Sequence, residues 1–168
     1  MPKIILLVEN DDDKLRPAAN IVCYMVADTL SAAKINDVRQ TGGMVLAFGG
    51  KALEICRRYD LDGIVAEPDT SKPLKKQLKP LREALNKKTL GVIIPARRHE
   101  AMLAGEIEPE FIAFRAEGSP HDKDIVSWYN DLFLIPSAWI VSDGGAPDDI
   151  PDVDFAIVRA KNFENFGC

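Results

Sequence analysis

The sequence predicts an α/β protein whose parallel strands close, or nearly close, into a β/α barrel of about seven strands. Short apolar, β-branched runs alternate with segments of helical periodicity along all 168 residues. The strand runs are continuously apolar, as is usual for parallel strands covered on both faces. More than five such strands with short crossovers favour closure of the sheet. We therefore expect one barrel-like domain over residues 1–168.

The first third of the chain contains one ambiguous segment. Ile4 to Val8 is a strand, and GGMVLAFGG over residues 42–50 is a buried strand between glycines. Residues 16–39 are predicted as mostly helix, because apolar side chains recur there at spacings of three and four: Ile21, Val22, Met25, Val26, Leu30 and Ala33. The run AANIVCYMV within this segment is apolar enough to be an additional strand, and that alternative stays open.

In the middle of the chain, two helices flank a strand. KALEICRRY over residues 51–59 places its apolar side chains on one helical face, and Asp62 to Glu67 is the strand. Residues 71–88 carry a leucine stripe that predicts a second helix, with Pro73 suited to its first turn. Pro80 is expected to kink or interrupt that helix, because proline lacks the N–H and crowds the preceding turn.

The second half of the chain keeps the same alternation. It predicts strands at TLGVIIP (89–95), EFIAF (110–114), SAWIVSDGG (137–145) and FAIVRA (155–160), and helices at RRHEAMLAGEI (97–107) and HDKDIVSWYNDLF (121–133). The polar stretch GAPDDIPDVD connects the last two strands as a loop.

Composition limits the classes of partner. The net charge of -5 gives no basic footprint, so nucleic acid is not an expected partner. No apolar run approaches membrane-spanning length, and the N-terminus turns acidic where a signal peptide would need its apolar centre. The three widely separated cysteines fit neither a disulfide framework nor a zinc site. We expect a cytoplasmic protein with no membrane partner.

The opening IILLVENDDD is also how phosphoacceptor receiver domains begin. A receiver needs a phosphoacceptor Asp at the end of its third strand, where DGIVAEPD has Glu67 first and Asp69 two residues later. It also needs a Lys after its fifth strand, where EFIAFRAEG offers Arg115. These departures make a receiver-like domain the weaker hypothesis. The acidic residues are then expected to form the solvated exit of the first strand.

Several segments together resemble the thiamine-phosphate synthases. DLDGIVAEPDTSKP is similar to a strand that delivers a Gln and an Asp to the active site of that family, and TLGVIIPARRHEAMLAGEIEPEFIAF is similar to the next βα unit. SAWIVSDGG resembles the penultimate strand with its double glycine, and FAIVRA resembles the last strand. The resemblance covers roughly residues 43–160 and implies a divergent β/α barrel, about one βα unit short of eight. The family's reaction joins a pyrimidine diphosphate to a thiazole phosphate with Mg²⁺.

The resemblance also implies a set of ligand-binding positions. Gly144 and Gly145 match the turn whose N–H groups hold a phosphate, and Arg159 with Ala160 completes that phosphate site. Asp69 stands near the metal-binding Asp and makes Mg²⁺ a possible cofactor. Because carboxyl ends of barrel strands share one mouth, further ligand contacts are expected from Glu67, Arg97, Arg115 and Ser142.

Other family positions are missing. The Gln-x-Arg-x-Lys pattern that grips the diphosphate has no counterpart between Asn10 and Gly42, and Gly49–Gly50 replaces an Asn-Asp pair. The synthase reaction is therefore doubtful. We expect a protein that binds a phosphorylated small molecule, with a homodimer as a candidate assembly; the alternative is a non-catalytic α/β binding or regulatory module.

Simpler interpretations of the same residues stay open. Asp69 is also suited to a turn that caps the following helix, and SDGG is also suited to a plain turn. Arg97 is also placed to decorate the exposed start of a helix.

Overall fold

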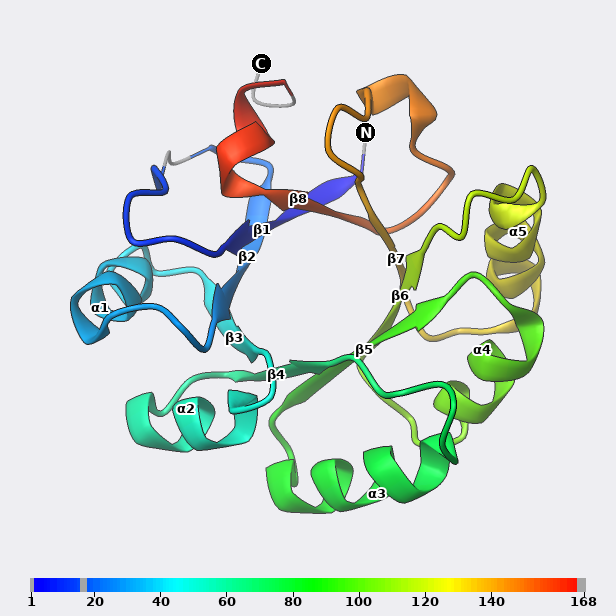
Figure 1. Ribbon diagram of the computed structural model, residues 1–168, viewed down its shortest axis with the longest axis horizontal. Helices are drawn as coiled ribbons and strands as arrows, with labels where there is room; N and C mark the ends of the chain where they lie inside the picture. Colours follow the sequence, from blue (N-terminus) through cyan, green and yellow to red (C-terminus); the bar gives the residue numbers. More distant parts are fainter. Residues whose placement is uncertain (1, 16–17, 166–168) are drawn as a thin grey trace.

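In the computed structural model, which describes residues 2–15 and 18–165, eight parallel strands form a closed barrel in the order of the sequence (Figure 1). The predicted parallel β/α barrel is confirmed, with eight strands in place of about seven. The strands are β1 (Lys3–Val8), β2 (Ile21–Ala27), β3 (Met44–Phe48), β4 (Gly63–Ala66), β5 (Thr89–Pro95), β6 (Phe111–Arg115), β7 (Ser137–Ile140) and β8 (Phe155–Arg159).

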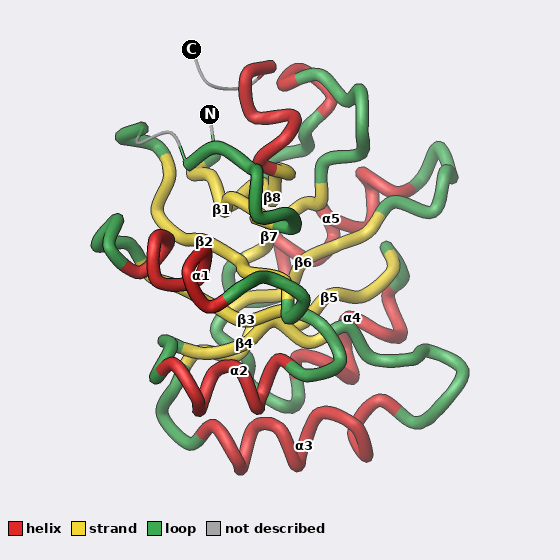
Figure 2. The backbone as a smooth tube through the Cα atoms, turned by 60° about the vertical axis from the view of Figure 1, so that its left-hand side comes forward, coloured by secondary structure: helices red, strands yellow, loops and turns green. Residues whose placement is uncertain are grey.

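Helices lie outside the ring of strands and cover most of its circumference (Figures 1 and 2). They are α1 (Ala32–Arg39), α2 (Ala52–Tyr59), α3 (Leu74–Leu85), α4 (Arg98–Gly105) and α5 (Asp122–Leu132). A 3-10 turn, η1 (Pro147–Asp149), lies between β7 and β8, and η2 (Ala160–Asn165) follows β8. Within the described residues, no helix has the length and apolar character needed to cross a membrane.

The strand that the sequence analysis did not count is β2, which lies in the segment predicted as mostly helix. That prediction was wrong for Ile21–Ala27, where the alternative of an additional strand holds, and right for Ala32–Arg39. Cys23 and Met25 belong to the apolar cluster inside the barrel, while Tyr24 and Val26 belong to the cluster under the helices. Both faces of β2 are thus covered, so the segment is apolar throughout and carries no pure strand periodicity.

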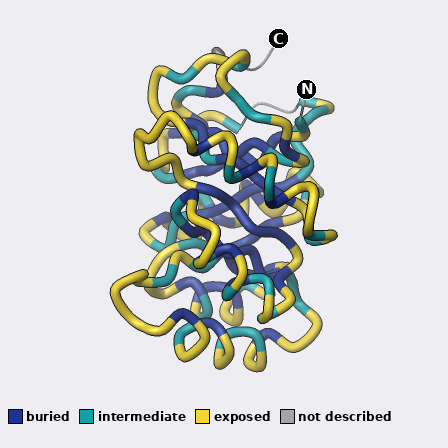
Figure 3. Tube along the Cα trace, turned by 90° about the vertical axis from the view of Figure 1, so that its right-hand side faces the viewer, coloured by how far each residue is buried: buried dark blue, intermediate teal, exposed yellow. Residues whose placement is uncertain are grey.

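Pro80 neither ends nor interrupts α3, contrary to the expected interruption. Pro80 is exposed. Exposed residues lie mainly on the outer helices and loops, and buried ones mainly on the strands inside (Figure 3). The carbonyl left without its N–H partner there can be hydrated, so the helix tolerates the proline.

Two apolar layers hold the fold together. The inner layer fills the barrel with side chains from every strand, among them Leu7, Met25, Leu46, Val65 and Ile93. The outer layer joins the other face of the strands to the buried stripes of the helices. Because strand side chains alternate, each strand supplies both layers. The inner layer then continues, two residues further along several strands, into the polar mouth of the barrel.

One glycine is required by a close approach of two strands. A Cβ atom added to Gly63 would lie 1.9 Å from the backbone oxygen of Thr89 on the neighbouring strand. Gly50 has nothing within 4 Å of the corresponding position.

We predict that Gly63→Ala lowers the free energy of unfolding by about 2 kcal/mol or more, because the backbone of β5 must move away. Gly50→Ala is the matched control and should change stability by less than about 0.5 kcal/mol. Urea denaturation of both variants measures this, and equal stabilities would contradict the packing described.

Candidate functional site

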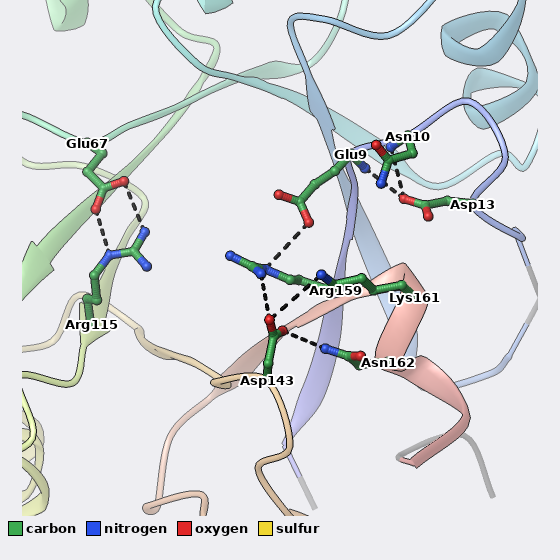
Figure 4. A network of polar contacts seen from close by, with 9 residues as sticks. All are labelled: Glu9, Asn10, Asp13, Glu67, Arg115, Asp143, Arg159, Lys161 and Asn162. Atoms are coloured by element: carbon green, nitrogen blue, oxygen red, sulfur yellow. Dashed lines mark hydrogen bonds and ion pairs between the residues drawn. The ribbon is translucent and has the colours of Figure 1, made fainter.

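Four charged side chains surround the mouth at the carboxyl ends of the strands. Each follows, by two residues, an apolar residue of the inner layer, so the strand period directs it toward the same side. This charged ring consists of Glu9 after β1, Glu67 after β4, Arg115 at the end of β6 and Arg159 at the end of β8 (Figure 4). The polar end of the barrel is thus encoded in the last inward-facing position of these strands.

On one side of the mouth, Glu67 and Arg115 bind each other. Arg115 Nε and Nη2 donate to the two carboxylate oxygens of Glu67 at 2.7 and 3.0 Å, a bidentate contact that spans from β4 to β6. Both side chains are more than a third exposed, so the pair contributes at most about 1 kcal/mol to stability. Two residues predicted to contact a ligand are therefore neutralised by each other.

On the other side, three donors converge on the carboxylate of Asp143. Asn162 Nδ2 donates to Oδ1 at 2.7 Å, Arg159 Nη1 donates to Oδ2 at 3.0 Å, and Lys161 Nζ lies 3.7 Å from Oδ2 (Figure 4). We call Arg159, Lys161 and Asn162 the donor cluster. Its arginine also lies 3.4 Å, Nε to Oε1, from Glu9 of the charged ring. The hydrogen bond from Asn162, and then the charges of Arg159 and Lys161, hold the pKa of Asp143 below its ordinary value.

The predicted phosphate loop lies directly beside this cluster. Gly144 has a φ of +78°, a left-handed conformation that favours glycine. The N–H of Gly145 donates to the Ser142 carbonyl at 2.9 Å and closes a turn. Ala160 is buried and begins η2, which carries the other two members of the donor cluster. Of the four residues predicted for phosphate, Arg159 binds the Asp143 carboxylate and Gly144 directly follows Asp143 in the chain. The position that the prediction gives to a phosphate lies next to a carboxylate of the chain itself.

The acidic opening sequence holds the loop after β1 in place. Asp13 is buried and accepts the backbone N–H groups of Glu9 at 2.9 Å and Asn10 at 3.0 Å. Asp11 accepts the N–H of Ser31, at the start of α1, at 2.9 Å. The expectation of a wholly solvated exit was wrong for Asp13, because its carboxylate satisfies backbone donors of the turn. This turn positions Glu9 at the mouth.

Asp69 lies in a turn, which agrees with the simpler of its two interpretations from the sequence. Its Oδ1 accepts the Ser71 N–H at 2.9 Å and the Ser71 hydroxyl at 2.6 Å, and these bonds lower the pKa of Asp69. Within residues 2–15 and 18–165, no three His, Cys, Asp or Glu side chains gather where they could hold a metal ion. A magnesium site needs several oxygen ligands. The described residues therefore do not fit a preformed magnesium site.

Arg97 lies outside the charged ring. It is the N-cap residue directly before α4 and pairs with Glu117, Nη2 to Oε1 at 2.5 Å, and with Glu100, Nη1 to Oε1 at 3.3 Å. These partners come from the β6–α5 loop and from its own helix. Both partners bind the Arg97 guanidinium at the start of a helix. This agrees with the simpler interpretation of Arg97 as an exposed residue at a helix start.

Four residues of the mouth were not among the predicted contacts. They are Glu9, Asp143, Lys161 and Asn162. A local signal existed for the last two, because Lys161 and Asn162 directly follow the last strand at the shared end of the barrel. No local signal indicates that Asp143 and Glu9 meet the same arginine, because the pairing joins opposite ends of the chain.

Comparison with known proteins supports the barrel type. No protein-family model matches the chain, and no curated protein sequence matches it either. Among solved structures, a thiamine phosphate pyrophosphorylase from Pyrococcus furiosus superimposes with a TM-score of 0.66 over 97% of this chain and 92% of that chain, at 13% sequence identity. The expected thiamine-phosphate-synthase-like β/α barrel is thus confirmed as a fold. At this identity, the similarity concerns the fold alone.

The titration of Asp143 tests the geometry of the donor cluster. Asn162→Ala should raise the pKa of the Asp143 carboxyl toward its ordinary value, because the largest stabilising contact of the charged form is lost. Arg159→Ala should raise it as well. Carbon-detected NMR of the carboxyl group across acidic pH measures both shifts.

The unaltered protein carries the corresponding pH dependence. Because the folded pKa of Asp143 lies below the unfolded value, its contribution to stability is present above the unfolded pKa and is lost as the pH falls through the folded one. An Asp143 pKa that is unchanged in both variants would contradict the convergence of donors on this carboxylate.

Proposed function

We propose that the protein binds a small phosphorylated molecule at the mouth of the barrel, where the phosphate takes the place of the Asp143 carboxylate. The observation that carries this proposal is the convergence of Arg159, Lys161 and Asn162 on one carboxylate. An arginine, a lysine and an amide N–H that bind a carboxylate oxygen are also suitable donors for a phosphate oxygen.

The place of the cluster in the fold supports the same conclusion. In β/α barrels, ligands bind at the carboxyl ends of the strands, and phosphate sites are frequent after the last two strands. The donor cluster follows β8, and Asp143 follows β7. The loop that carries Asp143 turns at Gly144, a left-handed glycine on the exposed surface. Our proposal requires this loop to move the carboxylate away from the donors when phosphate binds.

A binding role is favoured over synthase turnover. In the sequence, the cationic pattern expected to grip a diphosphate is absent, and Glu67 neutralises Arg115 across the mouth. Departure of pyrophosphate needs cations around the leaving group. A single phosphate needs fewer charges, and the donor cluster supplies two.

We predict that inorganic phosphate or phenyl phosphate raises the melting temperature of the protein at low ionic strength. Asp143→Asn should tighten binding roughly fivefold, because removal of one nearby negative charge is worth about 1 kcal/mol in water. Arg159→Ala should reduce the shift, whereas Arg58→Ala, which removes an exposed arginine paired with Glu54 on α2, should leave it unchanged. If neither the unaltered protein nor Asp143→Asn shows a phosphate-dependent shift, the double glycine is only a turn.

We also predict that the protein converts the two thiamine precursors very slowly or not at all in the presence of Mg²⁺. The rate of turnover is measured by chromatographic detection of thiamine phosphate over time. Turnover on the order of one per second or faster would restore a full synthase function.

A further inference from the structure

The amino-terminal end of the barrel holds a pocket of about 340 Å³, opposite the charged mouth. Its walls come from the first inward-facing positions of several strands, and apolar side chains predominate among them. Those that define it are Ile5, Cys23, Met44, Leu46, Phe111 and Phe155. We call it the amino-terminal pocket.

Small residues at strand starts leave this space open. β2 contributes only the medium-sized side chains of Val22 and Cys23 near its start, and β4, which begins with Gly63, places no side chain among the lining residues. Large side chains from other strands surround the gap without filling it. The rings of Phe111 and Phe155 stand 6.1 Å apart at 58° to each other on one wall.

The walls carry no free charge in the part of the chain that the structure describes. Burial raises the pKa of the Cys23 thiol to about 12, so the group is neutral at physiological pH. Glu110 at the rim binds Arg82, Oε2 to Nη1 at 2.8 Å, and accepts the Leu90 N–H at 2.8 Å. An ion or a strongly polar molecule would find nothing to replace its hydration.

The closed sheet limits what can occupy the pocket. A peptide that entered the barrel would bury its backbone N–H and C=O groups. The strands around it could not pair with these groups, because their own N–H and C=O groups already form the hydrogen bonds of the closed sheet. A small molecule has no such requirement. Cavities of roughly 150 Å³ lined by Leu, Ile and Phe bind benzene, and pockets of roughly 300 Å³ or more accommodate larger ligands.

We propose that the amino-terminal pocket binds a small uncharged aromatic molecule of one or two rings. The tilted pair of phenylalanines favours an aromatic guest, because its ring can meet one of them edge to face and the other in an offset stack. The site is independent of the phosphate proposed for the mouth, since the two lie at opposite ends of the barrel and share no residue.

Indole is the probe, and the methionine methyl groups, labelled with carbon-13, are the reporters. Met44 is 43% exposed at the pocket, and Met102 is 52% exposed on α4. Indole should shift the Met44 methyl signal saturably and leave the Met102 signal in place. An equal shift of both methyl groups, or no saturation up to the solubility of indole, would overturn the proposal.

Variants of the pocket distinguish specific binding of indole from nonspecific association with exposed apolar side chains. Cys23→Leu should weaken indole binding at least tenfold, because the added bulk fills the space between the walls. Met44→Glu should reduce the rise in melting temperature caused by indole, and Met102→Glu, an equivalent change on a different exposed methionine, should not. Because Met44 is exposed, its variant tests the proposal even if Cys23→Leu does not fold. Unchanged binding in Met44→Glu, or sedimentation as a dimer with the Met44 signal insensitive to indole, would refute a small-molecule site.

Discussion

The barrel closes where β1 pairs in parallel with β8, and this contact joins residues from the two ends of the chain. Lys3 pairs with Phe155 and Leu7 pairs with Arg159, so every strand has a neighbour on both sides. A closed sheet has no exposed edge and encloses its own apolar layer. The charged mouth depends on the same pairing, because it brings Glu9 beside Arg159.

The mouth is self-neutralising. Each arginine of the charged ring meets a glutamate, and Arg159 meets Asp143 as well. These side chains are between about a third and about half exposed, so their pairing contributes little to stability. For the phosphate binding that we propose, the carboxylate of Asp143 is a competitor that the anion has to displace. In that proposal, the affinity for phosphate depends on how readily the β7–β8 loop gives up its contacts with the donor cluster.

The two ends of the barrel differ in chemistry because the inner residues differ along each strand. At the carboxyl end, the inward positions carry Glu67, Arg115 and Arg159. At the amino end, they carry apolar side chains and a neutral thiol. The packed middle layer of the barrel separates the two regions.

The sequence by itself determined the α/β class, seven of the eight strands and the shared mouth. Continuous apolar runs and helical stripes are local patterns, and the strand order follows from the right-handed crossovers between them. The resemblance of DLDGIVAEPDTSKP and SAWIVSDGG to one family also indicated the correct type of barrel. The loop after β7 and the end of β8, where a phosphate was predicted, meet at the contact between Asp143 and Arg159.

Only the tertiary structure decided the rest. Residues 21–27 became a strand because β1 and β3 offer hydrogen-bond partners on both sides, a non-local condition that overrides helical spacing. Asp143 and Glu9 are distant in sequence and meet at Arg159 through barrel closure. The amino-terminal pocket likewise depends on side chains from separate strands. The periodicity of the sequence indicates which face of a helix or strand is buried. Which side chains from distant parts of the chain meet is decided only when β1 pairs with β8 and closes the barrel.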